Sequence, residues 1–184
     1  MIDKTIIYNY NTMCMVIELL QLSINNSYDE YNMLQHIEKT ENGFINDVHG
    51  MSFDEYKQWL KKEDDYSQSK NLPKNWIPQT TFFLYVDRTP VGIGRIRHYS
   101  NEYLERNGVG NLGYGIAKPY RGKGYGNILF ENLLIKCKSF GYKKIKLFPY
   151  INNISTNKIM LKYGAKLIGT LNEEKNIYEI PIEI

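Results

Sequence analysis

The chain has 184 residues, of which 42% are hydrophobic and 23% are charged, and its formal net charge at pH 7 is +3. This length suits one domain that buries a substantial core without disulfides or metal. The mild charge does not provide the concentrated basic surface that nucleic acids bind, and no apolar run approaches the ~20 residues of a membrane span. We therefore expect a single domain over residues 1–184 that binds neither nucleic acid nor membrane.

The start of the chain carries Asp3 and Lys4 and lacks the apolar stretch of a signal peptide. Cys14 and Cys137 lie in apolar runs without a Cys-x-x-Cys or Cys/His spacing. This pattern indicates reduced, buried thiols and not metal ligands. We expect a cytoplasmic protein without a metal site.

The first part of the chain gives two helix predictions. Apolar residues recur at helical spacing over residues 12–24. Ser52 to Glu55 form a capping box, which predicts a helix from Phe53 to the region of Lys61, followed by a polar loop.

The second part alternates between strand and helix patterns. Residues 80–86 and 91–98 flank a turn and predict an antiparallel hairpin. The further predicted elements are a glycine-rich strand over 110–117, a helix over 127–140, a strand over 143–150, a helix over 154–163 and short strands over 166–171 and 177–182. This order predicts an α/β (α+β) fold with one mixed, mostly antiparallel sheet of six or seven strands, flanked by helices.

The most informative segment lies between the glycine-rich strand and the helix that follows it. Gly122, Gly124 and Gly126 let successive backbone amides approach one anion, and the helix start adds its positive end. Arg121 and Lys123 supply cationic side chains. The segment predicts a phosphate-binding loop that extends through Tyr125 and Asn127.

Two common phosphate motifs do not fit this segment. A P-loop needs Ser or Thr after Gly-Lys, whereas Gly124 follows Lys123. A dinucleotide fingerprint needs Gly-x-Gly-x-x-Gly and an acidic residue on the next strand, but the glycine spacing differs and residues 144–148 contain no acid. Nucleotide hydrolysis and dinucleotide binding are therefore disfavoured.

The pattern Arg-x-x-Gly-x-Gly at Arg121, Gly124 and Gly126 resembles the acetyl-CoA pyrophosphate loop of the GNAT N-acetyltransferase superfamily. Asn153 opens a predicted helix that ends at Gly164, which resembles the second motif of that superfamily.

The resemblance covers residues 82–171, about half of the chain. Within it, Val91–His98 and Gly113–Ile116 resemble a little-characterised bacterial subfamily of predicted GNAT acetyltransferases. The resemblance implies a splayed central strand pair, a CoA-binding core over roughly 80–171 and acceptor-side helices over roughly 10–75.

The resemblance also implies the activity and the cofactor. An acetyl group would pass from acetyl-CoA to the primary amine of a small molecule or peptide by direct attack, without a covalent enzyme intermediate. Arg121 and the amides of residues 122–127 would hold the pyrophosphate, and the backbone of Tyr114 and Ile116 would bind pantetheine. Asn153 would either contact the cofactor or only cap its helix, and Gly164 is expected to be a helix stop.

The proton-transfer groups depart from the family pattern. Met160 stands where many relatives have a tyrosine acid, and Phe148 stands where some have a glutamate base. His98, Tyr114 and Tyr150 are the remaining candidates for the chemistry, since histidine and tyrosine can exchange protons. A structural role is the commoner one for each of them, since a lone histidine is more often structural or exposed and a tyrosine more often packs with its hydroxyl satisfied.

Three other interpretations remain open. The chain can be an acyl-CoA-binding or sensor protein with impaired catalysis. Met160 and Phe148, at the positions of the family's acid and base, support this interpretation. It can acetylate a protein N-terminus or lysine. It can also be an α/β domain unrelated to CoA if the glycine segment is only a turn. Proteins of this fold often pair through their sheets, so a homodimer is a further expectation.

Overall fold

The computed structural model describes residues 6–10 and 13–182. Its main strands are β1 (Ile6–Tyr10), β2 (Met13–Gln21), β5 (Gln79–Val86), β6 (Thr89–Arg97), β7 (Leu112–Ile116), β8 (Lys144–Leu147), β9 (Lys166–Leu171) and β10 (Lys175–Pro181). Over these residues the strands form a five-stranded sheet of order β1-β2-β5-β6-β7 and a three-stranded sheet of order β8-β10-β9. Every pairing in the two sheets is antiparallel.

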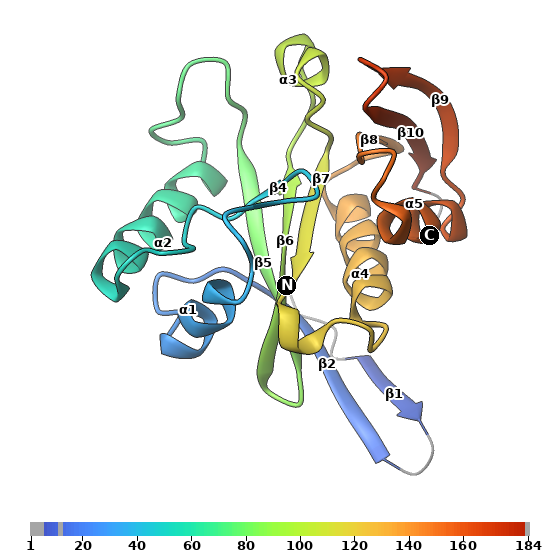
Figure 1. The fold of residues 1–184 in the computed structure, drawn as a ribbon. Coiled ribbons are helices and arrows are strands. Elements are labelled where there is room, and N and C mark those ends of the chain that lie inside the picture. The colour runs from blue at the N-terminus through green and yellow to red at the C-terminus, as the bar shows by residue number, and fades with distance from the viewer. Residues whose placement is uncertain (1–5, 11–12, 183–184) are drawn as a thin grey trace.

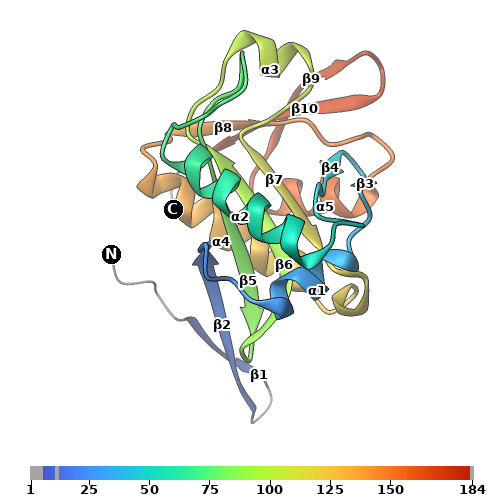
Figure 2. The same cartoon turned by 90° about the vertical axis from the view of Figure 1, so that its left-hand side faces the viewer.

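The helices cover the larger sheet on both faces. They are α1 (Tyr28–Gln35), α2 (Phe53–Ser67), α3 (Glu102–Arg106), the 3₁₀ helix η1 (Lys118–Tyr120), α4 (Tyr125–Ser139) and α5 (Ile154–Lys162). Figure 1 shows α1 and α2 on one side of the sheet and α4 on the other. A small hairpin of β3 (Thr40–Glu41) and β4 (Phe44–Ile45), called the β3–β4 hairpin below, lies on the α2 side next to β7 (Figure 2).

Strand β5 connects the two core layers of the described chain. All of its residues are buried, and successive side chains point to opposite faces of the sheet. Phe82 and Leu84 pack in the core that contains α4, whereas Phe83 and Tyr85 pack in the core that contains α2. The alternating side chains of β5 therefore contribute to an apolar core on each face of the larger sheet.

Strands β7 and β8 belong to different sheets and meet at one end. The Asn111 amide donates to the Lys146 carbonyl at 2.9 Å, and the Lys146 amide donates to Asn111 Oδ1 at 2.7 Å. Gly110 allows this approach, because a Cβ there would lie 2.6 Å from the same carbonyl oxygen. Among the described residues no other hydrogen bond links β7 to β8, so the two strands splay beyond this joint.

The predicted fold class is confirmed, since helices flank a mostly antiparallel arrangement of strands. The predicted single sheet is present as five and three strands that meet at Asn111. The capping box at Ser52 and Glu55 is confirmed, although α2 continues to Ser67, beyond the expected end near Lys61. The short helix α3 lies in the connection between β6 and β7, where no helix was predicted.

The predicted helix over residues 12–24 is wrong, because Met13–Gln21 is strand β2. Ile17 and Leu19 pack in the α4-side core, and Leu20 packs against the α2-side core. Apolar residues on both faces of a strand reproduce the i, i+3, i+4 spacing of an amphipathic helix.

The other local predictions concern single residues. Gly164 follows α5 with φ at +83°, as expected for a helix stop. Cys137 is a buried free thiol, while the side chain of Cys14 lies outside the described residues. The described residues contain no cluster of three His, Cys, Asp or Glu side chains that could hold a metal ion. None of the helices described here has the length and apolar character needed to cross a membrane.

Candidate functional site

The glycine segment forms an open turn at the start of α4. Gly122 and Gly124 have φ angles of +75° and +84°, in the left-handed region that favours glycine. A Cβ built at either position would meet no atom within 4 Å. The space into which side chains at these two positions would project is therefore free of protein atoms.

Five successive backbone amides, from Gly122 to Gly126, donate to no protein acceptor in the described part of the chain. The next two, of Asn127 and Ile128, already donate to the Gly124 carbonyl at 3.0 and 3.3 Å. Free amides at a helix start, together with the helix dipole, attract an anion. The turn can therefore bind a phosphate or diphosphate through residues 122–126, whereas the Asn127 amide is already used.

Arg121 connects this turn to two other elements. Its Nε donates to the Ile116 carbonyl at 2.8 Å, and its two Nη atoms donate to the Glu41 carboxylate at 2.7 Å each. The hydrogen bond from Arg121 lowers the pKa of Glu41. Arg121 therefore lies beside the turn while its guanidinium is paired with the β3–β4 hairpin. Lys123, at the turn itself, lies with its Nζ 5.6 Å from the ring centroid of Tyr120.

The backbone of β7 offers free groups on the splayed side. The Ala117 amide donates to Val91 in β6, and the Asn111 carbonyl accepts from Arg97 at the other end of the strand. Because antiparallel backbone groups alternate in direction, the amides and carbonyls of Tyr114 and Ile116 point away from β6. They face the opening between β7 and β8. Since the Ile116 carbonyl already accepts from Arg121 Nε, the free groups in the described structure are the Tyr114 amide and carbonyl and the Ile116 amide.

The Tyr114 side chain reaches α5. Its hydroxyl lies 3.4 Å from Thr156 Oγ1, and its ring packs on Phe130 with 5.5 Å between centroids. Burial raises the pKa of Tyr114 to about 12. Met160 is four residues after Thr156 on α5 and only 4% exposed. The phenol of Tyr114 thus lies one helical turn from the position where the family tyrosine is replaced.

The β3–β4 hairpin spans the opening on the α2 side. A Cβ built on Gly115 would lie 3.3 Å from the Phe44 ring, and one built on Gly43 would lie 3.2 Å from the Tyr150 ring. Phe44 therefore covers the bare glycine face of β7, while the hairpin tip lies next to Tyr150, three residues after the end of β8.

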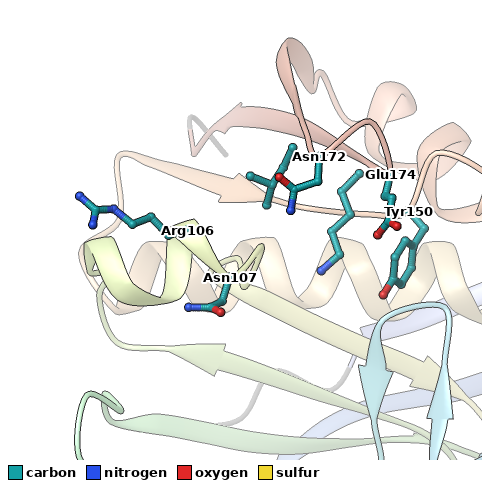
Figure 3. Close-up of a pocket in the computed structure, with 7 residues that line it drawn as sticks. Arg106, Asn107, Tyr150, Asn172 and Glu174 are labelled. Atoms are coloured by element: carbon teal, nitrogen blue, oxygen red, sulfur yellow. The ribbon is translucent and has the colours of Figure 1, made fainter.

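Tyr150 lines a polar cavity of about 220 Å³. Figure 3 shows it between the end of α3 and the β9–β10 turn, with Tyr150 on the side of the β3–β4 hairpin. The residues that line it are Arg106, Asn107, Tyr150, Leu171, Asn172, Glu174 and Lys175. The cavity is open, and it adjoins the splayed strands through Tyr150.

A buried charge cluster lies behind the β3–β4 hairpin. Arg95 is 7% exposed; its Nη1 donates to the Ile45 carbonyl at 2.8 Å, and its Nε lies 3.9 Å from the Glu63 carboxylate. Within the described residues its Nε and Nη2 have no hydrogen-bond acceptor. Burial, together with the charge of Arg95, lowers the pKa of the neighbouring Arg97 to about 10. This side of the larger sheet therefore carries a buried Arg95–Glu63 pair in which the arginine keeps unused donors.

His98 is not brought together with the glycine turn. Its Nε2 lies 2.8 Å from Thr80 Oγ1, and its ring packs on Phe140, which caps the C-terminal end of α4. A helix of 15 residues is about 22 Å long, and the glycine turn is at its other end. Of the three residues considered for proton transfer, only Tyr114 and Tyr150 lie next to the splayed strands.

Asn153 caps α5, since its Oδ1 accepts from the Thr156 amide at 3.2 Å. The hydrogen bond expected if Asn153 caps the helix is therefore present. A cofactor contact by Asn153 stays a prediction.

Sequence reasoning missed three residues that the fold adds to this region. Glu41 pairs with Arg121 over 80 positions, Thr156 meets Tyr114, and Lys175 lies over Tyr150 with 5.0 Å from Nζ to the ring centroid. Glu41 and Lys175 belong to no motif, and Thr156 lies in the second motif without being one of its characteristic residues. Each contact joins segments far apart in the chain, so the sequence carries no local signal for the three contacts.

The comparison with protein families identifies the chain. The model of the acetyltransferase (GNAT) family matches residues 45–165, which is more than half of the sequence. The chain therefore belongs to the GNAT acetyltransferase family. A search of curated protein sequences found no match.

Solved structures share the fold at low sequence identity. A GNAT acetyltransferase from Streptococcus pneumoniae has a TM-score of 0.58 and 15% identity, covering 89% of this chain and 96% of its own. The RimL ribosomal L7/L12 alpha-N-protein acetyltransferase, solved with coenzyme A, has a TM-score of 0.63 and 12% identity, covering 96% and 98%. A chimera of the Vibrio cholerae spermidine N-acetyltransferase has a TM-score of 0.60 and 16% identity, covering 90% and 95%. These proteins are similar to the chain in fold alone.

Proposed function

We propose that the chain is a cytoplasmic N-acetyltransferase that transfers the acetyl group of acetyl-CoA to the primary amine of a small molecule or peptide. The observation that carries this proposal is the run of free amides from Gly122 to Gly126 at the start of α4. The diphosphate of CoA matches this run in charge and in hydrogen-bonding capacity, since it is an anion that only accepts.

The rest of the cofactor would follow β7. The backbone groups of Tyr114 and Ile116 face the splayed side and would pair with pantetheine as an added strand. This path would put the thioester between β7 and Tyr150. A backbone amide of β7 would then stabilise the oxyanion of the tetrahedral intermediate.

The chemistry would be direct attack within a ternary complex. The amine nitrogen forms a bond to the thioester carbon, and the C–S bond breaks. The nitrogen loses one proton and the CoA sulfur gains one, so the step is balanced. Tyr114 stays protonated at neutral pH because its pKa is about 12, so its hydroxyl can donate a hydrogen bond to the departing sulfur. Tyr150, on the acceptor side, would orient the amine.

A covalent intermediate on Cys137 has no support. Its thiol is completely buried, and burial raises its pKa to about 12, so the nucleophilic thiolate is scarce. Direct transfer needs no such group.

A second candidate function is CoA binding without turnover. It is favoured by Met160, which is buried in the core and cannot donate a proton. Both candidates predict acetyl-CoA binding, and they separate when CoA release is measured with a panel of amines. Release with any amine at a rate above that of hydrolysis supports the transferase.

The first test is a calorimetric titration with acetyl-CoA. We expect one site with micromolar affinity, weakened at least about tenfold by Gly124→Val, which fills the open turn. Gly141→Val is the matched control, since Gly141 follows the opposite end of α4 with φ at +79° and no atom within 4 Å of its built Cβ. Absence of binding at millimolar acetyl-CoA, or equal weakening by both variants, would refute the proposal.

A further inference from the structure

The cavity beside Tyr150 has room for a small polar molecule. Its volume of about 220 Å³ corresponds to about seven water molecules at ~30 Å³ each, the size of an amino acid. Leu171 is its one aliphatic lining residue within the described chain; the others offer amides, a phenol and charges. Figure 3 shows the side chains of Asn107, Tyr150 and Glu174 around the space.

Positive charge exceeds negative charge in this cavity. Lys175 and Arg106 line it together with one carboxylate, that of Glu174. Arg106 pairs with Glu102 at 3.0 Å, but both side chains are at least 80% exposed, so the pair is weak and easily exchanged.

The Lys175 ammonium has no ionic partner in the described structure. Its Nζ donates to the Gly108 carbonyl at 3.1 Å and lies over the Tyr150 ring, while no described carboxylate lies within 4.0 Å. An ammonium group has three donors, so Lys175 retains hydrogen-bonding capacity. A carboxylate in the cavity would give it both a charge partner and an acceptor.

The cavity borders the splayed strands at Tyr150. Tyr150 contacts the tip of the β3–β4 hairpin at Gly43, and the same hairpin covers the glycine face of β7 with Phe44. A molecule in the cavity is therefore separated from the splayed strands by the Tyr150 side chain and the β3–β4 hairpin.

We propose that the acceptor amine carries a carboxylate, which Lys175 binds in this cavity while the amine extends past Tyr150 toward the thioester. This inference rests on the proposed acetyl transfer and narrows its acceptor to amino acids and compounds like them. Polyamines are disfavoured, because they would bring further positive charge to Lys175 and Arg106.

The test uses conjugates in which the CoA sulfur is joined through a CH₂–CO link to the nitrogen of an acceptor. Two matched pairs differ only in charge: glycine against glycinamide, and 4-aminobutyrate against 4-aminobutanamide. Calorimetry measures their binding without any turnover. In at least one pair we expect the carboxylate conjugate to bind about tenfold more tightly than its amide, as for one charge-assisted hydrogen bond.

Lys175→Met should remove this difference while leaving the affinity for CoA unchanged. Lys61→Met is the matched control, since Lys61 is an exposed lysine on α2 away from the cavity, and it should retain the difference. Equal binding within both pairs, or a preference that survives in Lys175→Met, would overturn the inference while the transferase proposal stands. Failure of CoA itself to bind would instead refute the proposed function.

Discussion

His98 packs at the C-terminal end of α4, remote from the glycine turn, so we expect no role for it in catalysis. We expect His98→Asn to retain the wild-type kcat. Burial lowers the pKa of His98 in the folded chain below its usual 6.5. As pH drops through 6.5, the imidazole is therefore protonated more readily in the unfolded chain than in the folded one, and the free energy of unfolding falls. The variant should lose less stability between pH 7.5 and pH 5 in urea unfolding. A kcat reduced more than about tenfold at unchanged stability would show that His98 takes part in catalysis.

Tyr114 is the residue that we expect to act on the leaving group. Tyr114→Phe removes the hydroxyl near Thr156 and should lower kcat about tenfold or more, while the dissociation constant of acetyl-CoA stays unchanged. Tyr142→Phe is the control, because Tyr142 is another partly buried phenol whose pKa is raised to about 12 but whose hydroxyl donates to Arg97 at the β7–β8 joint. Steady-state kinetics and calorimetry measure the two effects. Equal kcat in wild type and Tyr114→Phe would exclude the assigned role.

At the scale of elements, the β3–β4 hairpin competes with the cofactor for Arg121. The Glu41 carboxylate pairs with both Nη atoms of Arg121, so a diphosphate that uses this side chain has to displace it. We expect Glu41→Gln to tighten acetyl-CoA binding about threefold to tenfold, since the binding-competent arrangement is then more populated. Calorimetry measures the change.

Glu38→Gln is the control for this prediction. Glu38 pairs with Lys118 and also connects the segment before the hairpin to η1, but it does not touch the guanidinium of Arg121. It should leave acetyl-CoA affinity unchanged. Weaker binding in Glu41→Gln would show instead that Glu41 positions Arg121 for the cofactor.

The contrast between Gly124 and Glu41 explains how far the sequence could predict this region. The glycine turn and the capping box of α2 depend on residues that are neighbours in the chain, so their patterns are visible in the sequence. The partner of Arg121 and the cavity beside Tyr150 depend on contacts between distant segments, for which one sequence has no signal. β2 was predicted as a helix because a strand with two apolar faces lacks the alternation that identifies most strands.

At the scale of the whole molecule, the two sheets depend on one joint. Asn111 is 4% exposed; its Oδ1 accepts from the Lys146 amide and its Nδ2 donates to the Tyr142 hydroxyl. Asn111→Ala leaves the partly buried Lys146 amide without its side-chain acceptor and should lower the free energy of unfolding by about 1–3 kcal/mol. Urea unfolding followed by circular dichroism measures this loss. A variant as stable as wild type would mean that the apolar layers alone hold the sheets together.

The fold as a whole should lose stability in alkaline solution. Burial raises the pKa of Cys137 from 9.0 to about 12, and those of Tyr114 and Tyr142 from 10.0 to about 12. The folded-state pKa values of these groups exceed the unfolded ones. Their protonated forms therefore contribute fully to the free energy of unfolding below pH 9, and this contribution is lost as pH rises toward 12. We expect the melting temperature to fall steeply between pH 9 and pH 11, and less steeply in Tyr142→Phe, which lacks one such group. Tyr28→Phe, which removes an exposed phenol, should follow the wild-type curve, and a Tyr142→Phe curve parallel to wild type would contradict the assignment.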